Sequence, residues 1–261
     1  MDLSVVVPTY NEGDNIRPLC ERLMTACKQA GINAELLVMD DESAGSAQTQ
    51  KIVSELAKER HPIRMHMRSK AEGRGLSSAV LLGFQKARYE TVLCMDADLQ
   101  HEPEAVPNVA LPVLKKRAEF TVGSRYCNGG GMGFDWAIHR RLISWIATAL
   151  AYGVSRSSDP MSGFFCTRRA VIARADDRIN PIGFKIGLEL MARCRANPVV
   201  DVPITFQSRV AGESKLSMKQ NVLYIQQLLA LYWDYYRGII VMMALLLSLM
   251  ISYTTRKVFA L

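Results

Sequence analysis

The feature that most constrains the fold is a repeated alternation of short apolar runs and amphipathic segments in the N-terminal part of the chain. Leu3–Val7 is an apolar run without regular polar alternation, which predicts a strand buried on both faces. Similar runs at 34–39, 63–67 and 91–94 are separated by segments with helical period, such as residues 16–27. This pattern predicts an α/β fold with a mostly parallel, open sheet flanked by helices.

Polar side chains follow the ends of these predicted strands. The residues that share this placement are Tyr10, Glu12, Asp40, Asp41, Asp96 and Asp98. Ligands of open α/β sheets bind outside the carboxyl ends of the strands. We therefore expect a binding site at this edge of the sheet.

The segment after residues 91–94 carries two aspartates with one residue between them. Side chains alternate along a strand, so Asp96 and Asp98 point in the same direction, and the amide of Gln100 lies just beyond. Such oxygen ligands suit Mg²⁺ or Mn²⁺ bound to a diphosphate. The alternative is that the aspartates only solubilise the strand end and cap a helix that starts at Pro103.

The chain lacks the glycine-rich cradles that usually hold phosphates. Neither a Gly-x-Gly-x-x-Gly motif after the first predicted strand nor a Gly-Lys-Ser/Thr loop is present. A bound diphosphate would therefore need a metal and cationic side chains. The net charge of +7 also favours anionic partners, but the basic residues are dispersed and match no nucleic-acid motif, so we expect no nucleic-acid partner.

The cysteines and the N-terminus indicate the compartment. The six cysteines form no Cys-x-x-Cys pair or zinc-like spacing, which favours reduced residues in a cytosol-facing protein. No signal peptide is expected, because Leu3–Val7 is too short and is preceded by Asp2.

The C-terminal part has a different composition. Gly238–Thr255 is a run of eighteen residues without a charge, preceded by Arg237 and followed by Arg256 and Lys257. As a helix it would span roughly 27 Å, which is close to the thickness of a bilayer core. We expect a single membrane anchor, the alternative being a buried core helix.

The segment before this run has an apolar stripe at helical spacing. Trp233, Tyr235 and Tyr236 stand next to the predicted anchor, where amphipathic aromatics favour the headgroup zone. This segment is either a core-packed helix or a helix in the membrane interface. The expected organisation is a catalytic domain at 1–216, an amphipathic helix at 217–236 and an anchor at 237–261.

Several segments, in order, resemble family 2 glycosyltransferases of the GT-A, Rossmann-like type. They are Val5-Val6-Val7-Pro8-Thr9-Tyr10-Asn11-Glu12, Asp40-Asp41-Glu42-Ser43, Asp96-Ala97-Asp98-Leu99-Gln100-His101, Gly123-Ser124-Arg125-Tyr126, Arg140-Arg141-Leu142-Ile143-Ser144, Ser158-Asp159-Pro160-Met161-Ser162-Gly163-Phe164-Phe165, Gly183-Phe184-Lys185-Ile186 and Gly212-Glu213-Ser214-Lys215-Leu216-Ser217. The resemblance covers residues 3 to about 230. Within the family it is closer to the dolichyl-phosphate mannosyltransferases, and the terminal apolar run resembles their single-subunit form.

This resemblance implies an inverting transfer of mannose from GDP-mannose to dolichyl phosphate, with Mg²⁺ or Mn²⁺. It also implies an anchor in the endoplasmic reticulum membrane, a catalytic domain facing the cytosol and no obligatory protein subunit. Two alternatives remain open. One is a related transferase that uses UDP-glucose or another nucleotide sugar, and the other is an anchored nucleotide-binding adaptor without activity.

The resemblance also assigns roles to individual residues. Those implied in donor binding are Pro8, Tyr10, Glu12, Val38, Asp40, Asp41, Asp96, Ala97, Asp98, Arg125, Arg209 and Lys215. Those implied in metal binding are Asp96, Asp98 and Gln100, those in acceptor phosphate binding are Arg125, Arg140 and Ser144, and those in catalysis are Asp98, Arg125 and Arg209.

Helix geometry and local sequence context add further interpretations near these motifs. Arg140 and Ser144 are four apart in a helix predicted at 136–152, so one phosphate can contact both. We interpret His101 as structural, and Asp159-Pro160 as a turn that shapes the acceptor loop.

Overall fold

The computed structural model describes residues 1–133, 138–208 and 218–258. Its main element is a seven-stranded sheet in the order β3-β2-β1-β4-β7-β5-β8. The strands are β1 (Asp2–Thr9), β2 (Asn33–Asp40), β3 (Ile63–Met67), β4 (Thr91–Cys94), β5 (Phe120–Ser124), β7 (Phe165–Arg168) and β8 (Val199–Pro203). Among these described strands only β7 runs antiparallel to its neighbours. The predicted α/β class and mostly parallel sheet are confirmed.

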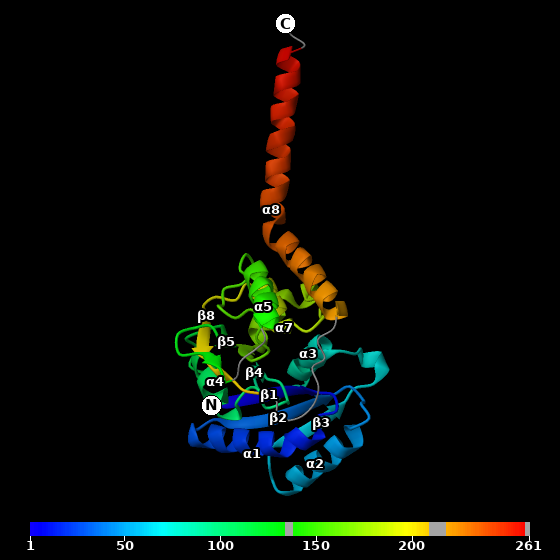
Figure 1. The fold of residues 1–261 in the computed structure, drawn as a ribbon, viewed down its shortest axis with the longest axis vertical. Helices are drawn as coiled ribbons and strands as arrows, with labels where there is room; N and C mark the ends of the chain where they lie inside the picture. Colours follow the sequence, from blue (N-terminus) through cyan, green and yellow to red (C-terminus); the bar gives the residue numbers. More distant parts are fainter. Residues whose placement is uncertain (134–137, 209–217, 259–261) are drawn as a thin grey trace.

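Helices cover both faces of this sheet. They are α1 (Gly13–Gln29), α2 (Ser46–Lys58), α3 (Leu76–Lys86), α4 (Val106–Leu114), α6 (Arg169–Ile172) and α7 (Ile186–Arg193), with 3-10 turns at Lys70–Glu72, Pro103–Ala105 and Ala173–Arg178. Helices α1 and α2 lie on one side of the sheet, and α3 and α7 lie on the other (Figure 1). A small second sheet pairs β6 (Gly131–Met132) with β9 (Thr205–Phe206).

The side chains of β1 show why the strand has no polar alternation. Leu3, Val5 and Val7 belong to the core on the α1 side, whereas Val6 belongs to the core on the α3 side. All four are fully buried. The sheet therefore has an apolar core on each face, as the continuous run predicts.

The order of the strands places the site. The chain runs outward from β1 through β2 to β3 and returns to place β4 on the other side of β1. This reversal makes the β1–β4 boundary a topological switch point, where open α/β sheets leave a crevice at the carboxyl ends of the strands. Tyr10 and Asp96 follow the two strands at this boundary.

The C-terminal part is one long helix, α8 (Met218–Val258). It bends where it leaves the domain, and its upper part extends away from the other elements (Figure 1). Within α8, Lys219–Ser248 is long and apolar enough to cross a membrane, and 11% of its most apolar window is buried. The amphipathic and anchor segments expected from the sequence are therefore parts of one continuous helix.

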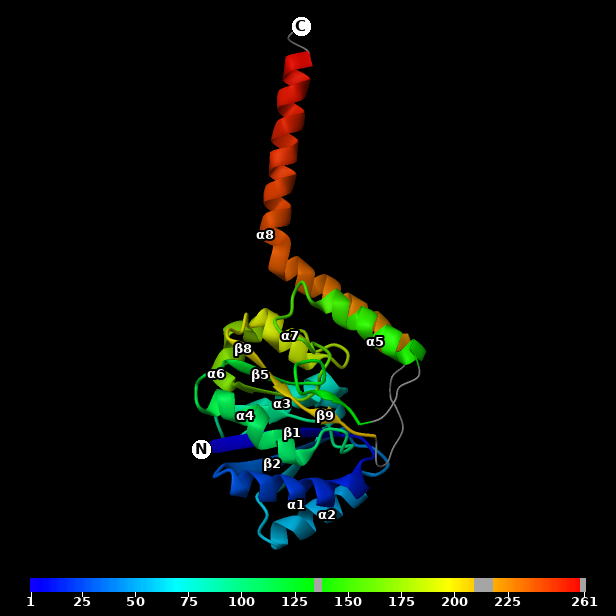
Figure 2. The same ribbon diagram turned by 60° about the vertical axis from the view of Figure 1, so that its left-hand side comes forward.

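Helix α5 (Ile138–Ala151) lies along the first part of α8 (Figure 2). Tyrosine hydroxyls of α8 donate to carbonyl oxygens at the end of α5: Tyr224 to Ala147 at 2.5 Å, Tyr232 to Leu150 at 2.9 Å and Tyr236 to Gly153 at 2.6 Å. The bond to Leu150 satisfies one of the carbonyls that the last turn of a helix leaves without a helical partner, and the other two fix α8 against α5 and the turn that follows it. The predicted helix start at Trp136 lies outside the described residues.

Replacing Gly83 of α3 with alanine should lower the melting temperature by several degrees. An added Cβ would come within 2.4 Å of Val6 Cγ1 and 3.0 Å of Met39 Cγ. Overpacking of this kind costs about 1–3 kcal/mol, and both neighbours are fixed in buried strands, so the clash outweighs the gain of about 1 kcal/mol in helix propensity.

The test compares the thermal unfolding of Gly83→Ala and Gly131→Ala in detergent. Gly131, in β6, is the control for an open site, because apart from its chain neighbours no atom lies within 4 Å of a Cβ added there. Equal melting temperatures for the two variants would contradict the close packing of α3 on the sheet.

Candidate active site

Asp40, at the end of β2, organises the loop that follows it. Its carboxylate is fully buried and accepts hydrogen bonds from the Thr9 hydroxyl at 2.9 Å and the Glu42 N–H at 3.0 Å. The Ser46 hydroxyl donates to the same carboxylate. These bonds join the ends of β1 and β2 to the start of α2. Asp40 thus shapes the floor of the crevice, and its predicted contact with a donor stays a prediction.

Asp41, the next residue, forms a largely buried ion pair. Its Oδ1 lies 2.5 Å from Arg68 Nη1, and its Oδ2 accepts from the Gly75 N–H at 2.7 Å, at the start of α3. The Arg68 guanidinium also donates to Ser78 Oγ at 2.7 Å. A buried charge needs such partners. Arg68 is therefore part of the framework of the site, and sequence analysis did not identify it.

The remaining predicted donor residues differ in exposure. Tyr10 is 47% exposed at the end of β1. Glu12 accepts a hydrogen bond from Asn15 Nδ2 at 3.0 Å, and Pro8 is half-buried. Val38 lies inside β2 with its side chain in the core. Tyr10 is therefore accessible to a ligand, whereas the side chain of Val38 is not.

Asp96, Asp98 and Gln100 lie in the turn after β4. Asp96 is 37% exposed at its side chain. Asp98 is buried, and its Oδ1 accepts from the Gln100 N–H at 3.2 Å. Gln100 Nε2 donates to the carbonyl of Gln207 at 2.9 Å, which places this turn beside the segment after β9. Leu99, between Asp98 and Gln100, has a left-handed backbone (φ +59°), a conformation that often marks functional turns.

His101 is buried next to the same turn. It is 3% exposed and packs against the rings of Phe164 and Phe206 at centroid distances of 5.1 and 5.2 Å. Its Nδ1 accepts the Asp96 N–H at 3.4 Å, and burial lowers the pKa of His101 to about 4. A neutral imidazole in an aromatic pocket agrees with the structural interpretation.

Arg125, after β5, is held by Asp159. The guanidinium Nε and Nη2 lie 2.7 and 2.8 Å from the two carboxylate oxygens, and the Arg125 backbone N–H donates to Asp159 at 3.1 Å. Both side chains are almost completely buried. Burial lowers the pKa of Arg125, but the bonds and charge of Asp159 outweigh that effect and raise it. The predicted Asp159-Pro160 turn therefore positions Arg125.

Lys185 is a second cation beside these residues, and sequence analysis gave it no role. Its Nζ donates to the carbonyl of Met161 at 3.0 Å. Burial and then the charge of Arg125 lower the pKa of Lys185, while Asp96 and Asp159 oppose that shift. The side chain therefore lies within electrostatic reach of both Arg125 and Asp96. The only sequence signal for Lys185 was that its segment, Gly183–Ile186, is among those that resemble the family.

The structure brings together only part of the predicted acceptor set. Ser144, on α5, lies 3.3 Å from the hydroxyl of Tyr126, the neighbour of Arg125. This contact places α5 next to the loop after β5. Arg209 and Lys215 lie outside the described residues, and so does the side chain of Arg140.

The Asp96–Asp98 turn suits a divalent cation that takes further ligands from a substrate. Within residues 1–133, 138–208 and 218–258, no group of three His, Cys, Asp or Glu side chains could hold a metal. Mg²⁺ is commonly held by one or two carboxylates together with substrate phosphates. Space beside Asp96 is maintained by Gly163, because a Cβ there would come within 3.3 Å of Asp96 Oδ2.

Comparison with known proteins agrees with this geometry. The model of the family "Glycosyl transferase family 2" matches residues 4–177. The chain is 43% identical over 236 residues to a dolichol-phosphate mannosyltransferase of Mycosarcoma maydis, covering 88% of this chain and 78% of that protein. It is 42% identical over 239 residues to the protein of that name in Saccharomyces cerevisiae, covering 89% and 87%.

A solved structure has the same fold. It is glucosyl-3-phosphoglycerate synthase from Mycobacterium tuberculosis in complex with Mn²⁺, UDP and glucosyl-3-phosphoglycerate. The TM-score is 0.57 at 18% identity, and the match covers 88% of this chain and 78% of that one. At this identity the likeness establishes the fold only.

Replacing Asp159 with alanine should destabilise the protein by about 3–5 kcal/mol, because Arg125 would keep a buried charge without its partner. The expected fall in melting temperature is roughly 10 °C. The measurement is thermal unfolding in detergent.

The control is Glu104→Ala. Glu104 forms an equally close two-point pair with Arg22, at 2.7 Å for both bonds, but this pair is exposed to solvent. Loss of an exposed pair costs about 1 kcal/mol or less. Similar effects of the two substitutions would refute the structural importance of the buried pair.

Proposed function

We propose that this chain, which belongs to glycosyl transferase family 2, transfers mannose from GDP-mannose to dolichyl phosphate and releases GDP. The observation that carries the proposal is the meeting of an acidic turn with the buried side chain of Arg125 and the half-buried Lys185 at one edge of the sheet. Asp96 lies within electrostatic reach of both Arg125 and Lys185. The names of the two fungal relatives support the choice of sugar and acceptor.

The acidic turn fits a divalent cation, Mg²⁺ or Mn²⁺. Asp96, Asp98 and the amide oxygen of Gln100 would hold it, since the Gln100 nitrogen already donates to Gln207. When bound, the ion would neutralise negative charge on the diphosphate.

The nucleophile in this proposal is the lipid phosphate. A phosphate oxygen forms a bond to the anomeric carbon of mannose, and the bond from that carbon to the diphosphate oxygen breaks on the opposite face, which inverts the configuration. The acceptor is already an anion near neutral pH, so no general base is required. The difficulty is the repulsion between two anionic reactants.

The positive charges of Arg125 and Lys185 reduce this repulsion. Asp159 fixes the Arg125 guanidinium through two hydrogen bonds, and Met161 fixes the Lys185 ammonium. Cations held in place before the reaction stabilise developing charge without reorganisation. Arg209 and Lys215 would add charge from the segment 209–217, Arg140 and Ser144 would bind the acceptor phosphate, and Tyr10 would contact the base of the donor.

The exposed apolar side chains support a membrane location. Trp145 and Leu229 are both 67% exposed, and Trp233 is 57% exposed, on two helices that contact each other. We place α5 and the first part of α8 in the membrane interface and the rest of α8 across the bilayer. The domain boundaries at 216 and 236 and a cytosol-facing catalytic domain in the endoplasmic reticulum are parts of the same proposal.

The reconstituted chain should transfer labelled mannose from GDP-mannose to dolichyl phosphate, and EDTA should abolish the transfer. Asp98→Asn should give the same loss, because it removes a negative charge from the cation site. The measurement is lipid-extractable radiolabel, with UDP-glucose as a parallel donor. Label from UDP-glucose alone would refute the proposed donor, and GDP binding without any transfer would refute an enzyme.

Arg140→Ala should raise the KM for dolichyl phosphate at least ten-fold and leave GDP binding unchanged. Loss of one hydrogen bond from a charged donor to a phosphate is worth about 1.5–3 kcal/mol. The control is Arg141→Ala, because adjacent residues of a helix point in different directions. Unchanged acceptor kinetics in Arg140→Ala would contradict the acceptor role.

A further inference from the structure

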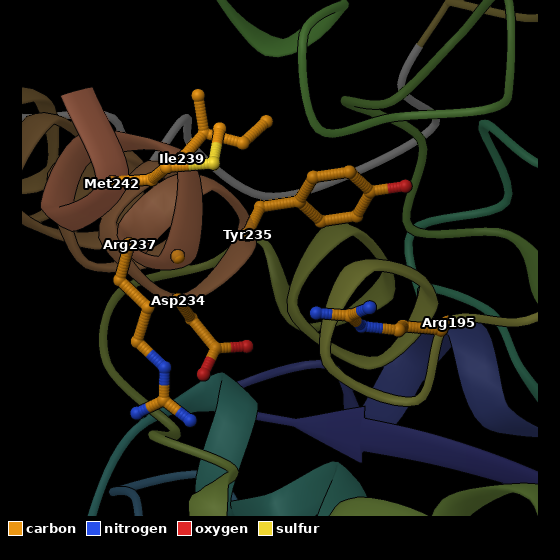
Figure 3. Close-up of a pocket in the computed structure, with 7 residues that line it drawn as sticks. Arg195, Asp234, Tyr235, Arg237, Ile239 and Met242 are labelled. Carbon is orange, nitrogen blue, oxygen red and sulfur yellow. The ribbon is translucent and has the colours of Figure 1, made fainter. Parts of the chain in front are cut away.

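A cavity of about 410 Å³ lies at the point where α8 leaves the catalytic domain. Its lining combines the turn after α7 with α8 and consists of Arg195, Asp234, Tyr235, Arg237, Gly238, Ile239 and Met242 (Figure 3). None of these residues belongs to the candidate active site. The cavity is therefore a separate feature, located at the boundary between the domain and the uncharged part of α8.

Two arginines give this cavity its charge. The Arg195 guanidinium lies 5.3 Å from the centre of the Tyr235 ring, and both Arg195 and Arg237 are exposed. The single carboxylate of the lining, Asp234, is engaged by Arg178 at 3.4 Å and Arg193 at 3.5 Å. Within the described part of the chain, neither Arg195 nor Arg237 forms an ion pair. The cavity therefore has an excess of positive charge.

The backbone at Arg195 allows the charge to be removed without strain. This residue has φ +48° and follows the last residues of α7, in a turn closed by the bond from Ala196 N to Met191 O at 3.2 Å. Glycine is the usual residue at this left-handed position, because a Cβ there is sterically costly. The chain has an arginine at a position where glycine would be more stable, so Arg195→Gly removes the charge without a cost to the fold.

The other side of the cavity is apolar. Ile239 and Met242 are 51% and 54% exposed and belong to the uncharged run that starts at Gly238. The cavity thus presents cations toward the domain and aliphatic side chains toward the proposed bilayer. A phospholipid has the same arrangement, with a phosphate above acyl chains.

We propose that this cavity binds the headgroup phosphate of an anionic phospholipid in the leaflet that faces the catalytic domain. The proposal rests on the membrane position of α8 proposed above. Arg195 and Arg237 contact the phosphate, and Ile239 and Met242 contact the upper acyl chain. A zwitterionic headgroup is disfavoured, because it brings no net negative charge to two cations that have no carboxylate partner of their own.

The test uses the full chain in mild detergent and measures the retention of phosphatidylserine relative to phosphatidylcholine by native mass spectrometry. Arg195→Gly and Arg237→Gln should each reduce the preference roughly five-fold, the effect of one basic residue near an anionic surface. The double variant should reduce it roughly twenty-five-fold. Arg195→Gly should melt at or above the temperature of the unaltered chain, which excludes loss of folding as the cause.

The matched control is Arg60→Gly. Arg60 has φ +67° and follows α2 in the same kind of turn, closed by the bond from His61 N to Leu56 O at 3.0 Å. The substitution Arg60→Gly removes the same charge from the same backbone conformation as Arg195→Gly. Helix α2 lies at the end of the molecule opposite to the upper part of α8 (Figure 1). Its lipid preference should equal that of the unaltered chain.

Equal preference in Arg195→Gly, Arg237→Gln and Arg60→Gly would overturn the proposal. Displacement of the phospholipid by an equal amount of dolichyl phosphate would also overturn it, because the cavity would then be an acceptor site. Extraction of membranes at high pH tests the anchor separately. Release of the unaltered chain by that treatment would refute the membrane position of α8 itself.

Discussion

The structure depends on a sheet that is covered on both faces. Because apolar side chains fill both faces of β1, this central strand presents accessible polar groups only at its ends. Ionised groups that are buried near the ends of the strands must be paired, since an isolated buried charge is very costly. Asp41 with Arg68 and Asp159 with Arg125 are such pairs. The same constraint that builds the core therefore also builds the walls of the site.

The two ion pairs differ in where the positive charge of their arginine acts. Arg68 lies wholly inside, so its pair with Asp41 fixes the loop after β2. Arg125 is anchored from one side by Asp159, and its charge still acts on Asp96 and Lys185. Burial lowers the pKa of Lys185, so this lysine is sensitive to nearby negative charge. An anionic ligand at this edge would favour its protonated form.

Local sequence patterns predicted the strands and the residues at their ends. The alternation of buried runs and helical segments depends on neighbouring residues, and Asp96 and Asp98 are recognisable from their spacing after a strand. The sequence did not reveal that Arg68 pairs with Asp41 or that Asp159 pairs with Arg125. The paired residues are 27 and 34 positions apart and meet only when the loops are folded. The sequence predicted an amphipathic helix and an anchor that meet at Arg237, and the structure shows both as parts of one helix, α8.

In the proposed function, the arrangement of α5 and α8 links the membrane to the active site. Three tyrosine hydroxyls of α8 bond to the end of α5, and Ser144 of α5 contacts Tyr126 beside Arg125. A chain of direct contacts therefore connects the proposed interface helices to the buried cation of the site. In the proposed reaction the tail of the polyprenyl phosphate stays in the bilayer, which requires Arg125 to lie at a fixed height above the lipid. Helices that lie in the interface and also contact the site fix that height without a separate domain.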